Sequence, residues 1–196
     1  MVSVRKNGLI GLLFLITAAQ AGCYPATIYK PVAAGVAPAS TPCAGRGGYL
    51  FVDRNGLRFA FHTTEESGKF YVYISVQKPL SPVPAKIEPP VQMNLSEFVV
   101  MDESTLERFK PIAFDRLESH GSVLVRKTVF PVDPAFTFNA KSADVRIGFS
   151  GEVADRDHLF LLIPKLVIDE QSVQLPGIEF IKTTELRGPA LDCEPQ

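Results

Sequence analysis

Hydrophobic and polar residues alternate along most of the chain after residue 47. The clearest run is residues 70–76, where every second residue from Phe70 to Val76 is apolar and the residues between are mostly polar. This period of two is typical of a β-strand with one buried face. Residues 57–61 show the same pattern. They follow Asn55-Gly56, a pair that tolerates positive φ in a tight turn, which predicts a hairpin with residues 49–53.

The second half of the chain continues this pattern. Extended segments are predicted over residues 91–101, 112–118, 122–130, 136–138, 145–149, 159–163, 165–168, 172–175 and 178–182. Residues 102–109 are the exception, because Ser104 and Glu107 have capping-box spacing and predict a short helix. About ten short strands with at most one short helix favour an all-β fold, an antiparallel β-sandwich of immunoglobulin-like type. A β-barrel is the alternative.

Two proline-rich segments interrupt the alternation. Residues 78–90 hold five prolines and are expected to form a loop, since proline cannot donate to a sheet ladder. Residues 23–42 are rich in Pro and Ala without any period, which predicts an extended tether able to reach roughly 60 Å. The expected organisation is therefore residues 1–22 as a leader, 23–42 as a tether and 43–196 as one domain.

The leader has the layout of an export signal. Arg5 and Lys6 precede an uncharged apolar run over residues 8–16, and small residues follow. The run is shorter than the roughly 20 residues that span a bilayer. Cleavage after Ala21 would release a soluble secreted or periplasmic chain. Alternatively, Ala21-Gly22-Cys23 resembles the lipobox of bacterial lipoproteins, although Gln20 stands where that motif usually has an aliphatic residue.

The lipobox resemblance implies that Cys23 is acylated and anchors the protein in a lipid bilayer. The residue after Cys23 is Tyr24 and not aspartate. By the same resemblance, this implies sorting to the outer membrane, facing the periplasm. Acylation also resolves the odd cysteine count, because Cys43 and Cys193 then remain as a pair. We expect these two to form a disulfide that closes the domain, worth about 5 kcal/mol in the chain-entropy model.

Composition excludes several function classes. The chain has 20 basic and 21 acidic residues and a net charge of −1, so a nucleic-acid partner is not expected. The three histidines, His62, His120 and His158, have no metal-ligand spacing. Asp155 and Asp157 lack the rest of a calcium loop. Ser150 lies in a sequence that only superficially matches a serine elbow. No catalytic residue, metal or cofactor is therefore predicted.

Tyr71 and Tyr73 form the candidate binding surface, because they share the strand face opposite the predicted core and aromatic residues are enriched at interaction hot spots. A covering loop is the competing explanation. The leading hypothesis is a non-catalytic envelope lipoprotein that binds an envelope protein or glycan. An exported hydrolase with dispersed catalytic residues and an accessory subunit of an envelope assembly are the alternatives.

Overall fold

The computed structural model describes residues 24–36, 48–77, 91–120, 123–128, 136–138 and 143–187. Within these ranges the chain is all-β, with antiparallel strands in three sheets. Helical structure there consists of two 3₁₀ turns, η1 (Leu95–Glu97) and η2 (Gly151–Asp155), and no helix is long and apolar enough to cross a membrane. The predicted antiparallel sandwich is confirmed, and none of the three sheets closes on itself.

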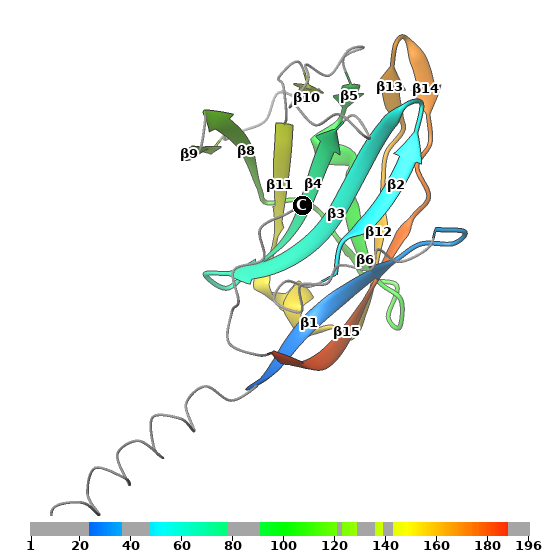
Figure 1. Ribbon diagram of the computed structural model, residues 1–196. Helices are drawn as coiled ribbons and strands as arrows, with labels where there is room; N and C mark the ends of the chain where they lie inside the picture. The colour runs from blue at the N-terminus through cyan, green and yellow to red at the C-terminus, as the bar shows by residue number, and fades with distance from the viewer. Residues whose placement is uncertain are drawn as a thin grey trace, which may run out of the picture.

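The three sheets take their strands from distant parts of the sequence (Figure 1). The five-stranded sheet has the order β1 (Tyr24–Val32), β15 (Ile178–Arg187), β12 (His158–Leu162), β6 (Val99–Asp102), β7 (Arg108–Phe109). The six-stranded sheet has the order β2 (Leu50–Arg54), β3 (Leu57–Glu66), β4 (Lys69–Gln77), β11 (Ala143–Phe149), β8 (Ala113–His120), β9 (Val123–Thr128). The four-stranded sheet has the order β10 (Phe136–Phe138), β5 (Val91–Met93), β13 (Leu166–Ile168), β14 (Gln171–Val173) and lies at the end of the molecule away from the β1–β15 pair.

The core lies between the five-stranded and six-stranded sheets and continues into the buried residues of the four-stranded sheet. The Phe70 ring on β4 contacts Tyr29 on β1 at 5.1 Å between centroids and Phe180 on β15 at 6.4 Å. The alternation predicted for β4 is observed: its inward-facing residues Phe70, Val72, Ile74 and Val76 are at most 1 % exposed. Burial of this one face per strand is what fixes the strand register, because a shift by one residue would turn the apolar set outward.

The hairpin predicted at Asn55-Gly56 is confirmed, and two further hairpins are present. Arg54 pairs with Leu57 across Asn55 and Gly56, which have φ of 50° and 71°. Asp169 and Glu170 join β13 to β14 in the same left-handed conformation. Strands β8 and β9 also pair antiparallel, from Asp115 opposite Thr128 to His120 opposite Val123. The extended segment predicted over residues 91–101 is divided, since η1 separates β5 from β6.

The short helix predicted over residues 102–109 is wrong. Val100 pairs with Phe109 and Met101 with Arg108, so this segment is a hairpin between β6 and β7. The Asp102 carboxylate accepts hydrogen bonds from the Ser104 amide at 2.8 Å and the Ser104 hydroxyl at 2.7 Å. These bonds give the backbone an alternative to a helical turn, and Leu106 takes φ of 60°.

The tether predicted over residues 23–42 is wrong for residues 24–32, which form β1. All of β1 pairs with β15, from Tyr24 opposite Arg187 to Val32 opposite Glu179. Its prolines are tolerated because β1 is an edge strand, where one side of the backbone needs no ladder hydrogen bonds. Ile28 and Tyr29 are buried in the core, so the folded domain begins well before residue 43. Cys23, Cys43, Cys193 and the proline-rich segment 78–90 lie outside the described residues.

Candidate functional site: a polar row on the six-stranded sheet

A row of polar and aromatic residues crosses the face of the six-stranded sheet that points away from the core. The strand register places His62 on β3 opposite Tyr73 on β4, Tyr73 opposite Arg146 on β11, and Arg146 opposite Asp115 on β8. Neighbours in such a row are close enough for direct contact. The predicted placement of Tyr73 on the outer face is therefore confirmed, and four strands contribute to its surroundings.

Arg146 is the centre of this row. It is 3 % exposed, and its Nε donates to Asp115 Oδ2 at 2.6 Å while Nη2 bonds to the same oxygen. Its Nη1 bonds to Glu66 and also donates to the Tyr73 hydroxyl at 3.3 Å. Burial by itself would lower the pKa of Arg146, but the bonds to Tyr73 and Asp115 outweigh it, and the pKa lies above its ordinary value.

These bonds define what the Arg146 cluster can do. Each nitrogen of the guanidinium already has an acceptor within the protein, and Asp115 is only 4 % exposed. An arginine that holds a substrate carboxylate or phosphate needs free donors in a forked arrangement. Arg146 therefore connects β11 to β8 and to the end of β3 through side-chain hydrogen bonds, and Asp115 and Glu66 compensate its buried charge.

Tyr71 lies one row away and is less accessible than the sequence suggested. Its ring is 6 % exposed and stacks beneath the Arg146 guanidinium at 4.2 Å. Gly148 on β11 is opposite Tyr71, and a Cβ there would lie 2.8 Å from the Tyr71 ring. The missing side chain at Gly148 thus makes room for Tyr71. Tyr71 and Tyr73 do share the outer face as predicted, but Tyr71 is buried and cannot itself offer a contact surface.

A set of partly exposed rings extends from Tyr73 toward the edge of the sheet, and we call Phe51, Tyr49, His62 and Tyr73 the aromatic row. His62 stacks on Tyr73 with centroids 4.3 Å apart, and Tyr49 meets the His62 ring edge-on at 4.6 Å. Tyr49 and Phe51 are parallel at 6.2 Å. All four residues are half-buried. Of these four residues the sequence predicts only Tyr73, because the other three join the row through the β2–β3–β4 register.

The edge of the aromatic row carries an ion pair. Arg58 lies over the Phe51 ring at 5.4 Å and its Nε is 2.8 Å from Asp53 Oδ1. Both charged side chains are well exposed. The aromatic row therefore has a polar, solvated rim at one end and the buried Arg146 cluster at the other, an arrangement that resembles the core and rim of a protein interface.

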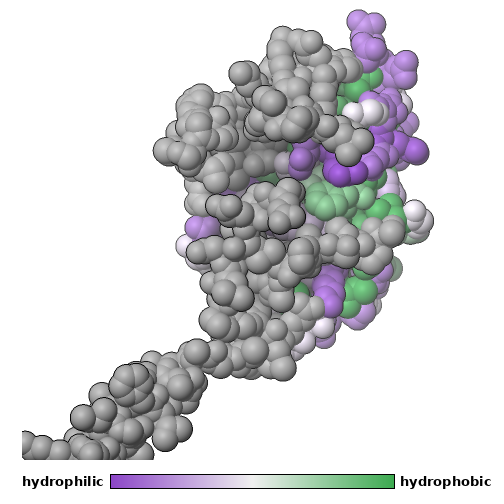
Figure 2. Space-filling view, in the orientation of Figure 1, coloured by the Kyte–Doolittle hydropathy of each residue, from purple (hydrophilic) through white to green (hydrophobic). Residues whose placement is uncertain are grey.

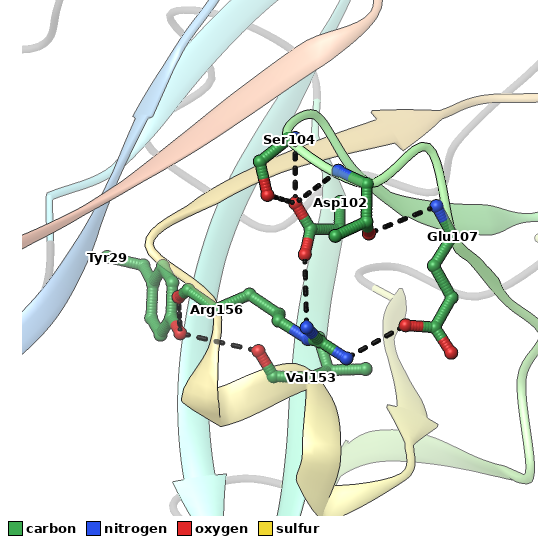
Figure 3. A network of polar contacts seen from close by, with 7 residues as sticks. Tyr29, Asp102, Ser104, Glu107, Val153 and Arg156 are labelled. Atoms are coloured by element: carbon green, nitrogen blue, oxygen red, sulfur yellow. Dashed lines mark hydrogen bonds and ion pairs between the residues drawn. The ribbon is translucent and has the colours of Figure 1, made fainter.

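A second polar network surrounds η2 at the five-stranded sheet (Figure 3). The Tyr29 hydroxyl lies 2.8 Å from the Ala154 carbonyl and 2.6 Å from the Arg156 carbonyl. Arg156 in turn reaches Glu107 at 2.8 Å and the buried Asp102 at 3.5 Å. The hydrogen bonds from Ser104 and Thr105 hold the pKa of Asp102 below its ordinary value of 3.8. These contacts fix η2 between β1 and the β6–β7 hairpin.

The residues considered for catalysis lie on separate elements of the described chain. Ser150 is the residue before η2, directly after β11, and its side chain makes no capping bond. It is followed by a 3₁₀ turn and not by the long helix of a serine elbow. His62 contacts aromatic rings, and nothing is described of the His120 side chain. The three histidines belong to β3, β8 and β12, in two different sheets.

Among the described residues, one group of potential metal ligands is present, on the outer face of the five-stranded sheet. Glu103, His158 and Glu179 each offer a ligand atom within 4.8 Å of the others. From the sequence, His158 is expected to lack metal-ligand spacing with the other two histidines, and the nearby Asp155 and Asp157 are not part of this group. Glu103 and Glu179 were missed because they are distant in the sequence, and only the strand order brings them to His158.

Comparisons with family models, with curated proteins and with solved structures found no match.

Proposed function

We propose that the protein is an exported, non-catalytic binding module of the cell envelope, anchored through acylated Cys23, and that the aromatic row contacts its partner. The observation that carries this proposal is the continuous contact of four partly exposed rings on the face opposite the core. Rings needed only for folding would be expected on the inner face, where Phe59, Phe61 and Phe70 are fully buried.

The chemistry of the aromatic row favours a protein partner. Tyrosine and histidine rings combine a large apolar area with a polar tip, which suits a surface that is solvent-exposed in the free protein and buried in a complex. The Arg58–Asp53 pair at its edge supplies polar groups for the rim. In Figure 2 the described surface on the visible face carries several hydrophobic areas separated by hydrophilic residues.

The position of β1 changes how the anchor would work. Because β1 begins at Tyr24, an acylated Cys23 would be directly joined to the folded sheet. The module would therefore be held at the bilayer surface, without the reach of about 60 Å that a tether of residues 23–42 would give. A partner in the same membrane, or one that contacts it closely, fits this arrangement.

The anchor is tested by replacing Cys23 with serine. We expect Cys23→Ser to move the protein from the membrane fraction to the soluble envelope fraction, and mass analysis of the parent protein to show the acyl chains. Sedimentation of the variant with membranes, to the same extent as the parent, would rule out acylation as the anchor.

The contact surface is tested by capture from detergent-solubilised envelopes. We expect a protein to be recovered with the parent and to be lost with Tyr49→Ser or Phe51→Ser, while Leu106→Ser retains it. Leu106 is a suitable control because it is 67 % exposed and lies on the β6–β7 hairpin, in the other sheet. Thermal midpoints of the variants establish that each is folded. Equal recovery with all variants, or variant-sensitive binding to cell-wall glycan alone, would contradict the proposal.

A further inference from the structure

The group formed by Glu103, His158 and Glu179 lies across three adjacent strands of the five-stranded sheet. His158 begins β12, which is flanked by β15 and β6. Glu179 on β15 is opposite Phe160, which is two residues after His158 on β12. Residues two apart share a strand face, so Glu179 and His158 both point to the outer face. Asp102 on β6 is opposite Leu159, which places Glu103 beside His158 on the other flank. The histidine is therefore between the two glutamates.

The backbone holds these three positions firmly. The Glu103 amide donates to the His158 carbonyl at 3.2 Å, which extends the β6–β12 ladder to the ligand positions. On the opposite face of the same strands, Leu159, Leu161, Ile178 and Phe180 are fully buried in the core. A rigid support of this kind matters because metal affinity depends on how well ligands are preorganised.

The side chains are near each other but remain adjustable. His158 Nδ1 is 3.7 Å from Glu179 Oε1, and the two side chains are 53 % and 33 % exposed. Tetrahedral ligands bound at about 2.1 Å are about 3.4 Å apart. The closest pair already approaches that spacing, and rotation of the exposed glutamates can bring in the third ligand.

We propose that Glu103, His158 and Glu179 bind one divalent first-row transition-metal ion, with Zn²⁺ as the representative case. One imidazole with two carboxylates is a donor set that zinc accepts, and three protein ligands leave a position for water. The bound cation also relieves the repulsion between the two glutamates. This site is independent of the proposed envelope function and lies on a different sheet from the aromatic row.

The proposal is tested by titrating the full-length purified protein with Zn²⁺, using calorimetry and amide NMR together. We expect one saturable site whose shift changes centre on Glu103, His158 and Glu179. This mapping separates the site from the cysteine thiols, which also bind zinc. His158→Ala and Glu179→Gln should each weaken binding by about tenfold or more, whereas Glu170→Gln, a carboxylate on the exposed β13–β14 turn, should leave it unchanged.

Thermal midpoints measured without metal establish that the variants are folded, and the midpoint of the parent should rise with added Zn²⁺ while that of His158→Ala should not. Absence of saturable binding at these residues, binding that maps elsewhere on the chain, or equal affinity in the parent and in both ligand variants would overturn the proposal.

Discussion

Removal of the Tyr29 hydroxyl tests whether β1 is an integral part of the folded domain. Tyr29 is 3 % exposed, and its ring packs edge-on against Phe70 in the opposite sheet. Its hydroxyl bonds to carbonyls at the end of η2. Tyr29→Phe keeps the ring and its packing, so the change isolates the hydrogen bonds. A residue in a solvated tether would tolerate this substitution without effect.

The expected loss follows from the hydrogen-bond acceptors. A hydroxyl has one proton to donate, so the 2.6 Å and 2.8 Å contacts with the Arg156 and Ala154 carbonyls share it. Lys182 Nζ also donates to the Ala154 carbonyl at 2.8 Å and remains after the change. The Arg156 carbonyl loses its bond to the hydroxyl. Leaving the Arg156 carbonyl without this hydrogen bond should lower the free energy of unfolding by about 2 kcal/mol. For a domain of this size, that corresponds to a decrease of about 4–8 °C in the thermal midpoint.

Calorimetry or denaturant unfolding measures this difference directly. Tyr49→Phe is the matched control, because it keeps the ring contacts with Phe51 and His62, and its effect should stay within about 0.5 kcal/mol. Equal midpoints for Tyr29→Phe, Tyr49→Phe and the parent would refute the reasoning and would return residues 24–32 to the tether interpretation.

The same residue gives a pH dependence. Burial, with smaller contributions from Glu65, Asp157 and Asp155, raises the pKa of Tyr29 above its ordinary value of 10.0. Above about pH 10 the unfolded chain releases this proton while the folded protein keeps it, so the free energy of unfolding falls as the pH rises. Tyr29→Phe should lack this part of the alkaline decline. An identical decline in the variant and the parent between about pH 9 and pH 11 would contradict the burial of this hydroxyl.

Three further changes test other parts of the structure. Gly151→Ala places a Cβ 2.4 Å from the Gly68 carbonyl oxygen and should cost about 1–3 kcal/mol in urea unfolding, whereas Gly48→Ala, with its nearest contact at 3.9 Å, should be neutral. Asp115→Ala leaves the buried Arg146 without its main partner and should cost about 3 kcal/mol, while Asp53→Ala at the exposed pair with Arg58 should cost less than about 1 kcal/mol by the same assay. Ser104→Ala should raise the pKa of Asp102 in a carboxyl NMR titration. Because folding lowers the pKa of Asp102 in the parent, the variant should lose free energy of unfolding near pH 7, and this loss should disappear as the pH falls below the pKa of Asp102 in the folded parent.

The sequence predicts those parts of the fold that depend on local signals. Asn55-Gly56 specifies its hairpin through positive φ, and the alternation from Phe70 to Val76 specifies which face is buried. The helix prediction for residues 102–109 is wrong for a physical reason. Capping-box spacing and an Asx turn use the same residue types, and here the Asp102 carboxylate accepts hydrogen bonds from Ser104 that favour the turn. Composition also hides β1, because Pro and Ala suit an edge strand as well as a linker.

The candidate sites are less predictable than the strands. Arg146 and Asp115 are separated by 31 residues, and Glu66 is 80 residues from Arg146, so only the order β3-β4-β11-β8 reveals their cluster. An arginine between Val145 and Ile147, in an otherwise apolar run over residues 145–149, is the one local signal that could have identified it. The group around His158 has no local signal, because each ligand comes from a different strand.

The pairing of β1 with β15 makes the beginning and the end of the domain neighbours. Tyr24 lies opposite Arg187, so the ladder that completes the five-stranded sheet joins residues at the greatest separation in the described chain. Contacts of this kind form late, because the whole intervening loop must be closed first. During synthesis β1 emerges first and has no partner until the last strand is made. The β1–β15 ladder therefore closes only after the other described strands have been made.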